Sequence, residues 1–348
     1  MNIIINGRCI GRKHKTYIVA ELSANHNQDF DQAVQLIKAA KEAGADAVKL
    51  QTYTPDTITI DCNNEYFRIG KGTIWEGKNL YELYKEAYTT WEWQPQLKQI
   101  ANDLGIDLFS TPFDPTAVDF LEEMGVPAYK VASCELVDIP LIQYIAKTGK
   151  PIIISTGMAT LAEIDEAVTA AREAGCKEIG LLKCTSAYPA KPEEMNLRTI
   201  PHMAEAFGVP VGLSDHTLGI AVSVAAVALG ACIVEKHVTL NRSIPGPDST
   251  FSLEPNEFKG MVDAIRTTEE ALGEVQYNVS GHELASRVFR RSLFVVTDIN
   301  KGDIYTKGNI RAIRPGYGLH TKYVNCVLGR KASRNIKRGE PLAWSVID

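Results

Sequence analysis

The feature that most constrains the fold is a unit that recurs along most of the chain: a short β-rich run, a polar loop, and an amphipathic helix ending near glycine. Apolar residues in this unit switch between periods of two and 3.6, which indicates alternating strands and helices. The expected strands are residues 17–21, 46–51, 106–110, 128–132, 152–155, 179–183, 209–213 and 231–237. The expected helices are residues 30–43, 94–104, 115–124, 139–147, 160–175, 196–207, 218–229 and 255–272.

This alternation predicts an α/β fold of the (β/α)8 TIM-barrel type. A doubly wound open sheet is the alternative, but such sheets usually carry a glycine-rich phosphate turn, and none follows residues 17–21. Residues 1–15 contain Asn6-Gly7, a hairpin turn signal, and we expect this hairpin to close the bottom of the barrel. The connection 52–92 exceeds an ordinary βα loop, and such insertions usually serve the active face.

The chain changes character after the last expected helix. We therefore expect a catalytic barrel over residues 1–273, a polar linker over 274–287, and a small domain over 288–348 with short strands, turns and no clear helix. Two similar phrases in the last part predict pseudo-symmetry: Asp298-Ile-Asn-Lys-Gly-Asp-Ile304 and Asn335-Ile-Lys-Arg-Gly-Glu-Pro341. A domain of about 60 residues has a marginal core, so it should lean on another surface.

Composition excludes several classes of function. The net charge is −5, and no basic run is long enough for a nucleic-acid or membrane patch. The seven cysteines are scattered and never form a CxxC pair, which disfavours a disulfide framework or a zinc cluster. The N-terminal residues show no apolar signal core, and the chain shows no run long enough to cross a bilayer. We expect a cytoplasmic protein.

Two histidines stand at the ends of neighbouring expected strands. His216 follows residues 209–213, and His237 ends residues 231–237. Parallel strands of a barrel end at the same mouth, which is where such barrels keep their chemistry. A single strand-end histidine is usually structural, but the matched placement of the pair favours a site. Two histidines leave several positions open on a divalent metal, which suits a catalytic ion.

Alternation along the strands predicts which other side chains face the mouth. If His237 and His216 face inward, so do Glu235 and Ser214, while Lys236 points outward. The mouth is then polar, whereas a purely structural barrel would place Val, Ile and Leu there. Lysines that converge with hydroxyl groups indicate an anion site. The remaining inward or loop positions are Glu21, Lys49, Gln51, Thr111, Lys130, Ser133, Glu135, Ser155 and Lys183.

Two rival interpretations remain open from the residues alone. Lys183, if it faces inward, would suit a Schiff-base aldolase or lyase. The non-enzymatic alternative is a carbohydrate- or ice-binding C-terminal module on an inert barrel, but it does not explain a polar mouth. Borohydride trapping with pyruvate distinguishes the Schiff-base enzyme from a metal-dependent one, because only the former gives an adduct. A chelator-sensitive activity excludes the non-enzymatic alternative.

Several phrases of the chain are shared, in order, with one enzyme family. On them the chain resembles the sialic acid synthase family over nearly its full length. The phrases are Ala20-Glu-Leu-Ser-Ala-Asn-His26, Val48-Lys-Leu-Gln-Thr-Tyr53, Ser110-Thr-Pro-Phe113, Tyr129-Lys-Val-Ala-Ser133, Ser155-Thr-Gly157, Lys183-Cys-Thr-Ser186, Ser214-Asp-His216, Glu235-Lys-His237, Gly246-Pro-Asp248 and Arg314-Pro-Gly316.

The resemblance implies a fold, a reaction and a partner. It implies a barrel joined to an antifreeze-like (SAF) C-terminal domain, which is swapped across a homodimer and caps the partner's active site. It also implies condensation of phosphoenolpyruvate with an N-acylated amino sugar, giving a nine-carbon 2-keto acid and phosphate. Mn²⁺ or Mg²⁺ would be the cofactor.

Carried over residue by residue, the resemblance assigns roles. His216 and His237 would hold the metal, and Glu21 beside them would steer protons or the attacking water, with Glu235 as a further catalytic residue. The phosphoenolpyruvate site would comprise Lys49, Thr111, Lys130, Ser133, Ser155, Ser186 and Ser214. The sugar site would comprise Gln51, Glu135, Tyr188, Asp248, and, from the other subunit, Phe289 and Arg314.

Within the family, some phrases look closer to the pseudaminic acid synthase branch. These are Gln51-Thr-Tyr-Thr-Pro-Asp-Thr57, Leu80-Tyr-Glu-Leu-Tyr84 and Lys183-Cys-Thr-Ser186. The expected sugar is therefore 2,4-diacetamido-2,4,6-trideoxy-L-altrose, and the aromatic segment 75–84 would suit a deoxy sugar. Gly246-Pro-Asp248 looks more like the neuraminate branch, so N-acetylneuraminate or legionaminate synthesis stays an alternative.

Overall fold

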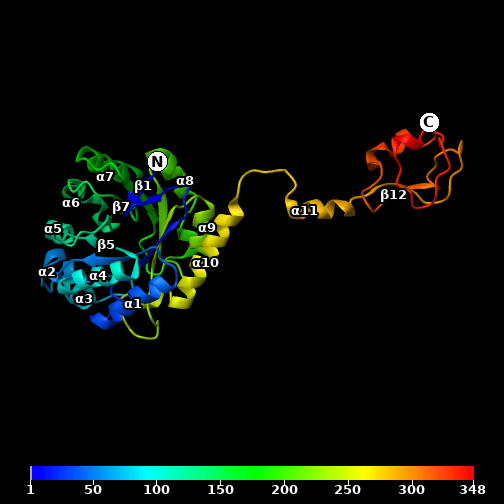
Figure 1. The fold of residues 1–348 in the computed structure, drawn as a ribbon. Helices are drawn as coiled ribbons and strands as arrows, with labels where there is room; N and C mark the ends of the chain where they lie inside the picture. Colours follow the sequence, from blue (N-terminus) through cyan, green and yellow to red (C-terminus); the bar gives the residue numbers. More distant parts are fainter. Residues whose placement is uncertain (1) are drawn as a thin grey trace. The chain divides into compact units, whose positions relative to one another are not determined.

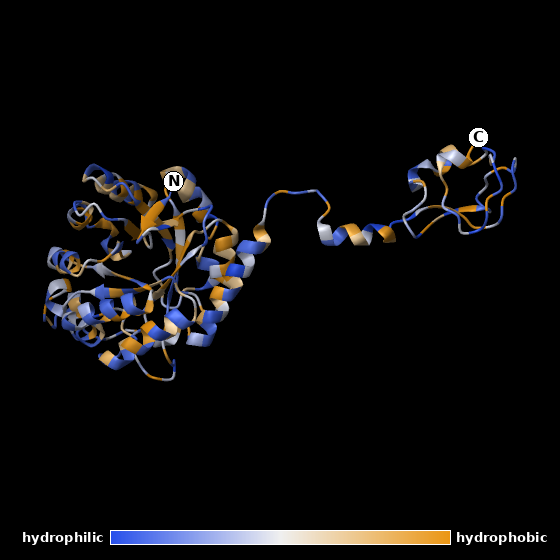
Figure 2. Cartoon of the chain, viewed as in Figure 1, coloured by the Kyte–Doolittle hydropathy of each residue, from blue (hydrophilic) through white to orange (hydrophobic). Residues whose placement is uncertain are grey.

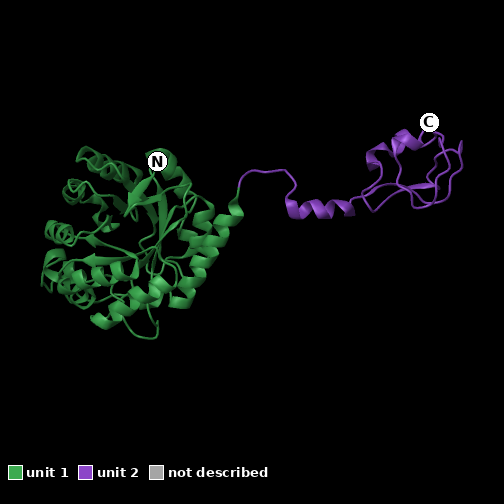
Figure 3. Ribbon diagram, viewed as in Figure 1, with its two compact units in different colours: residues 1–273 green, residues 274–348 purple. Residues whose placement is uncertain are grey.

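The computed structural model describes residues 2–348 and divides them into two compact units. The first unit ends at Gly273, and the second runs from Glu274 to Asp348 (Figure 3). Within the described residues, no helix combines the length and the apolar character needed to cross a membrane.

The first unit is a closed barrel of parallel strands in the order β10-β3-β4-β5-β6-β7-β8-β9 (Figure 1). This confirms the predicted (β/α)8 fold. All ends of the barrel strands agree with the sequence prediction to within two residues, and the expected strand 209–213 is shifted by two residues, to 211–215. The barrel strands are β3 (Tyr17–Glu21), β4 (Ala47–Thr52), β5 (Asp107–Pro112), β6 (Tyr129–Val131), β7 (Ile152–Ser155), β8 (Ile179–Cys184), β9 (Val211–Asp215) and β10 (Ile233–His237).

The helices surround the barrel with their apolar faces inward, as the orange interior of Figure 2 shows. Local signals fix where helices begin. The helix that begins at Pro115 is capped by the Asp114 carboxylate, which accepts a hydrogen bond from the Thr116 N–H. The helix that begins at Leu161 is capped by reciprocal hydrogen bonds between Thr160 and Glu163. The helices that follow the strands are α1 (Phe30–Glu42), α4 (Gln94–Leu104), α5 (Pro115–Glu123), α6 (Ile139–Ala146), α7 (Leu161–Glu173), α8 (Thr199–Phe207), α9 (Ala221–Ala228) and α10 (Pro255–Leu272).

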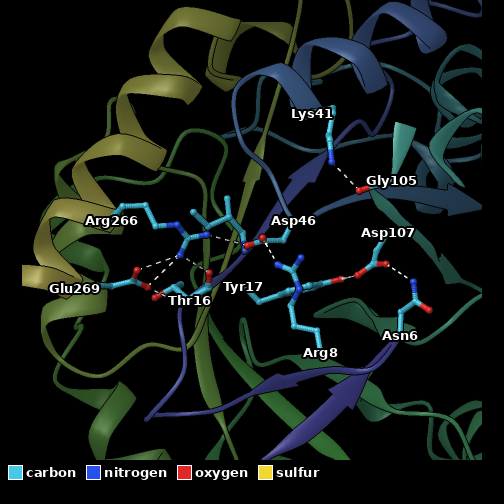
Figure 4. Close-up of polar contacts among 11 residues, drawn as sticks. Asn6, Arg8, Thr16, Tyr17, Lys41, Asp46, Gly105, Asp107, Arg266 and Glu269 are labelled. Carbon is cyan, nitrogen blue, oxygen red and sulfur yellow. Dashed lines mark hydrogen bonds and ion pairs between the residues drawn. The ribbon is translucent and has the colours of Figure 1, made fainter. Parts of the chain in front are cut away.

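An N-terminal hairpin closes one end of the barrel. Strands β1 (Ile3–Ile5) and β2 (Arg8–Ile10) pair across Asn6-Gly7, where both residues have positive φ, as this tight turn requires. Ile3, Ile5 and Ile10 of the hairpin are buried in the barrel core. Figure 4 shows its polar side chains bound at the same end, Asn6 to Asp107 and Arg8 to Asp46. This end is filled, so substrates must enter at the other.

The long connection after β4 is a folded insertion. It contains α2 (Pro55–Ile58), α3 (Leu80–Ala87), and short 3-10 turns at Glu65–Phe67 and Trp91–Trp93. The Trp91 indole N–H donates to the carbonyl of Tyr53 at 3.0 Å, which ties the end of the insertion to its start. The insertion therefore has a defined shape over the strand ends.

The second unit has its own small apolar core, which includes Leu293, Tyr305 and Val327. Strands β11 (Ser292–Val295) and β12 (Ile310–Ile313) form its sheet. The two similar phrases pair with each other, because Ile299 and Ile336 exchange both backbone hydrogen bonds, at 2.9 and 2.8 Å. The expectation of no helix is wrong in detail: α12 (Val324–Val327) lies here, and α11 (Gly281–Ser286) lies within the predicted linker.

Candidate active site

The two histidines meet at the open end of the barrel. Their ring centroids are 5.4 Å apart, and both side chains are buried. His237 ends β10, and His216 directly follows β9, because that strand continues to Asp215. The expected side-by-side placement is confirmed.

Each histidine is oriented through its Nδ1 atom. His216 Nδ1 lies 2.9 Å from the carbonyl of Thr185, and His237 Nδ1 lies 3.2 Å from the hydroxyl of Ser23. Histidines that bind metals commonly donate Nδ1–H in this way and coordinate through Nε2. Burial and neighbouring positive charges lower the pKa of His237 well below its usual value, so its ring is neutral at pH 7, as a ligand must be.

Within residues 2–348, no group of three or more His, Cys, Asp or Glu side chains has the geometry of a metal site. The pair alone fits an ion that also needs open positions for water and substrate. The two imidazoles and the hydrogen bonds at their Nδ1 atoms are therefore compatible with a divalent cation.

Buried charges surround the pair. Lys49 Nζ lies 2.6 Å from Glu21 Oε2 and 3.8 Å from Glu235 Oε1, and Lys130 Nζ lies 3.7 Å from the same Glu235 oxygen. Gln51 donates to Glu21 Oε1 at 2.8 Å. Strand register explains this cluster, because Glu21 pairs with both His237 and Lys49 on neighbouring strands.

The two carboxylates have different protonation behaviour. Burial, which outweighs the attraction of the Lys49 ammonium, raises the pKa of Glu21 to about 7. Burial also opposes ionisation of Glu235, but the Lys130 and Lys49 ammonium groups outweigh it and lower the pKa of Glu235. Glu21 can therefore exchange a proton near neutral pH, while Glu235 remains a fixed negative charge.

Hydroxyl donors line the space beside the lysines. Lys49 Nζ donates to Thr111 Oγ1 at 3.1 Å, Lys130 Nζ donates to Ser155 Oγ at 2.7 Å, and Ser214 Oγ donates to Glu235 at 3.3 Å. These contacts join residues from six strands. The predicted phosphoenolpyruvate residues of the strands therefore converge.

Gly157 completes this space. Its N–H donates to Ser133 Oγ at 3.0 Å, and a β-carbon at this position would lie 2.2 Å from Ser186 Oγ and 2.7 Å from Ser133 Oγ. Only glycine lets these groups approach so closely. Ser186 Oγ is buried without a hydrogen-bond partner in the described residues, which marks it as a donor awaiting an acceptor.

The predicted sugar residues of the barrel surround the same mouth. The Tyr188 ring lies 4.2 Å from that of His216, and Asp248 Oδ2 accepts a 2.5 Å hydrogen bond from Ser23. Burial raises the pKa of Glu135 to about 7, and its Oε2 is buried without a hydrogen-bond partner in residues 2–348. Phe289 and Arg314 are exposed and belong to the second unit, so their predicted roles at the site stay predictions.

Two family models cover most of the chain. A model described as the NeuB family matches residues 36–277, and one described as the SAF domain matches residues 290–347. The chain belongs to the NeuB family. A pseudaminic acid synthase from Helicobacter pylori is 48% identical over 95% of this chain and 97% of its own length. An N,N'-diacetyllegionaminic acid synthase from Legionella pneumophila is 38% identical over 97% of this chain and 96% of its own length.

A solved member supports the fold. The crystal structure of an N-acetylneuraminic acid synthetase from Leptospira borgpetersenii, in complex with citrate, superposes with a TM-score of 0.73 at 30% identity. The match covers 82% of this chain and 95% of that one. This chain is therefore a NeuB-family enzyme, a nonulosonate synthase with a barrel and an SAF domain.

One sequence prediction within this NeuB-family barrel is wrong. Lys183 was expected to face the mouth, but it is Cys184 that pairs with the inward Ser214 and lies beside His216, with Sγ 3.9 Å from Nδ1. Adjacent residues of a strand face opposite sides, so Lys183 points outward. Its ammonium donates to the Cys184 carbonyl and to Thr185. The Schiff-base interpretation therefore loses its geometric basis.

Trp75 belongs to the aromatic segment 75–84, which was expected to suit a deoxy sugar, and its ring centroid lies 5.5 Å from that of Tyr188. Phe251 and Ser23 were not predicted as site residues. The ring centroids of Phe251 and His237 are 5.0 Å apart. Ser23 contacts His237 and Asp248, yet it is 214 and 225 residues away from them in sequence. The signal available for Ser23 was its position directly after the first strand, within the NeuB-like phrase that includes Glu21.

Proposed function

We propose that this enzyme condenses phosphoenolpyruvate with 2,4-diacetamido-2,4,6-trideoxy-L-altrose, giving the nine-carbon keto acid pseudaminic acid and inorganic phosphate. The observation that carries the proposal is the convergence of two buried histidines, two buried lysines and two unlike carboxylates at one barrel mouth. The pseudaminic acid synthase from Helicobacter pylori, at 48% identity over most of both chains, supports the choice of product.

The lysine side of the mouth would bind phosphoenolpyruvate. Lys49 and Lys130 supply positive charge, and Thr111, Ser155 and Ser186 supply hydroxyl donors to anionic oxygens. Gly157 lets the Ser133 and Ser186 hydroxyl groups lie close together, where a side chain would displace them, so both could bind the same phosphate. These groups stay in contact with the phosphate while it becomes a leaving group.

The histidine side would hold Mn²⁺ or Mg²⁺ through His216 and His237. When bound, such an ion polarises the aldehyde oxygen of the open-chain sugar and so favours attack by C3 of phosphoenolpyruvate. The chain's own contribution is orientation, because both Nδ1 atoms are engaged and the neutral His237 ring is available as a ligand.

Glu21 would handle the proton of the water that adds at C2. Its Oε2 atom contacts Lys49 at 2.6 Å, so water that adds near the lysine is within reach of the carboxylate. A pKa of about 7 lets Glu21 accept that proton and release it again. The intermediate then loses phosphate by cleavage of the bond between C2 and the bridging oxygen.

An aromatic wall supports a deoxy sugar. The Tyr188 ring stacks near His216, Trp75 packs against Tyr188, and the Trp75 indole N–H donates to the Pro247 carbonyl at 3.0 Å. An open-chain six-carbon sugar extends about 6 Å from its aldehyde carbon. Its far end, a methyl group in the trideoxy sugar, would then meet the Trp75 ring.

The C-terminal unit would act in a homodimer. Through the family resemblance, Arg314 of the partner subunit would reach the N-acyl group of the sugar, with Phe289 of the partner subunit beside it. The exposure of both side chains in the second unit is compatible with such a contact. Analytical ultracentrifugation of the full chain would test whether it forms a dimer.

The decisive experiment offers the purified enzyme phosphoenolpyruvate with three sugars: the trideoxy altrose sugar, its legionaminate-pathway counterpart, and N-acetylmannosamine. Phosphate release should be fastest, by kcat/KM, with the altrose sugar. Preference for either of the others would reassign the product while leaving the chemistry intact. Absence of release with all three would contradict the proposal.

A further inference from the structure

Ser23 occupies an unusual position at the mouth of the barrel. It lies two residues after the end of β3, is 1% exposed, and has a backbone φ of +41°. Residues other than glycine rarely adopt this left-handed conformation, and a strained residue persists where its surroundings determine it. The position therefore calls for an explanation.

The Ser23 hydroxyl joins two residues that were predicted to serve different ligands. Its Oγ lies 2.5 Å from Asp248 Oδ2 and 3.2 Å from His237 Nδ1. A hydroxyl has one proton, and an ionised carboxylate can only accept, so the proton of Ser23 points toward Asp248. The hydroxyl oxygen is then left to accept from His237, which places the ring proton on Nδ1 and leaves the lone pair on Nε2.

The surrounding loop holds this arrangement in place. The Asn25 side chain donates to the Val238 carbonyl at 2.9 Å and to Ser252 Oγ at 2.8 Å. Ser252 in turn donates to the Asp248 carbonyl at 2.7 Å. The loop after β3 is thus bound to the segment after β10, and Ser23 has little freedom to turn away.

We propose that Ser23 is a positioning residue that serves both halves of the reaction. Through His237 it fixes the tautomer that presents Nε2 to a divalent cation, and through Asp248 it holds the carboxylate that faces the sugar. The strained backbone places one hydroxyl within reach of both partners. The inference rests on the proposed function, because it assumes a metal at His237 and a sugar at Asp248.

The test compares Ser23→Ala and Ser23→Gly with the wild type. Alanine removes only the hydroxyl, whereas glycine also relieves the positive φ, so a loss shared by both variants belongs to the hydroxyl. Asn6→Gly is the matched control, because Asn6 has a φ of +48° in the hairpin at the closed end. Binding of Mn²⁺ to chelator-treated full-length protein is measured by electron paramagnetic resonance, and the KM of each substrate by phosphate release.

Both Ser23 variants should bind Mn²⁺ about 10- to 100-fold more weakly, as loss of a ligand's hydrogen-bond partner typically causes. The KM of the sugar should rise about tenfold or more at saturating Mn²⁺, while that of phosphoenolpyruvate stays near wild type. Ser23→Gly should melt no lower than Ser23→Ala, and Asn6→Gly should bind Mn²⁺ like the wild type.

Unchanged Mn²⁺ affinity in both folded Ser23 variants would overturn the inference, and so would a wild type that binds no Mn²⁺. Preference of the wild type for another sugar would overturn only the product assignment, because the Mn²⁺ titration needs no sugar. The two failures are therefore distinguishable.

Discussion

Glu21 and Lys49 form a buried ion pair, with 2.6 Å between Oε2 and Nζ, on adjacent strands of the barrel. The pair lies between the histidines and the anion pocket, because Glu21 also pairs in register with His237 and Lys49 also contacts Thr111. A single contact thus joins the two halves of the site.

Glu21→Gln should lower kcat by about 10²- to 10⁴-fold, the range of a general acid or base. The amide keeps the shape of the side chain but cannot accept a proton from water. Phosphate release at saturating substrates measures the loss, and Glu173→Gln, on the exposed outer face of α7, is the control. A Glu21→Gln enzyme within threefold of wild type would remove Glu21 from the proton step.

Gly157→Ala should raise the KM for phosphoenolpyruvate about 10- to 100-fold without unfolding the barrel. The new methyl group would lie 2.2 Å from Ser186 Oγ, so it would displace a hydroxyl group that is proposed to bind the phosphate. Titration with phosphoenolpyruvate at saturating sugar tests this. Gly260→Ala in α10, where a β-carbon meets nothing within 4 Å, should leave KM unchanged. Equal KM values for all three proteins would place the phosphate elsewhere.

The barrel was predictable from sequence because each strand repeats one simple pattern and the polar residues fall at strand ends. Side chains alternate between the two faces of a strand, and this alternation alone predicted that the two histidines, Lys49 and Lys130 face the barrel mouth. Lys183 was misplaced because the strand was taken to end one residue early, and Cys184 occupies the inward position. Ser23 and Trp75 could not be found by counting, because their partners lie 172 to 225 residues away.

Trp75→Ala should weaken discrimination between the trideoxy sugar and its analogue with a hydroxyl at C6. Apolar contact favours a methyl group over a hydroxymethyl group by about 10- to 100-fold, so most of that ratio should disappear. The ratio of the two kcat/KM values is the measurement. Tyr66→Ala changes an aromatic residue of the same insertion that is 81% exposed, and it should preserve the ratio. A ratio unaffected by loss of Trp75 would disprove the aromatic wall.

Glu135→Gln should change how stability depends on pH. Burial raises the pKa of Glu135 from 4.5 to about 7 in the folded protein, so the folded state holds the proton more tightly than the unfolded state. This contribution is complete below pH 4.5 and is lost as the pH rises through 7, amounting to at most about 3 kcal/mol. Urea unfolding at pH 5 and pH 8 should show a smaller difference in the variant. If the free energy of unfolding changed by the same amount between pH 5 and pH 8 in the wild type and the variant, Glu135 would be ionised in the folded protein at pH 5.

Steady-state phosphate release by chelator-treated enzyme tests the central claim most directly, because this activity requires the anion pocket, the histidine pair and the sugar site together. With phosphoenolpyruvate and the trideoxy altrose sugar, added Mn²⁺ should restore release in the wild type but not in His237→Ala, which should keep its circular dichroism spectrum. Release that persists without metal or without sugar, or that survives in His237→Ala, would contradict the account.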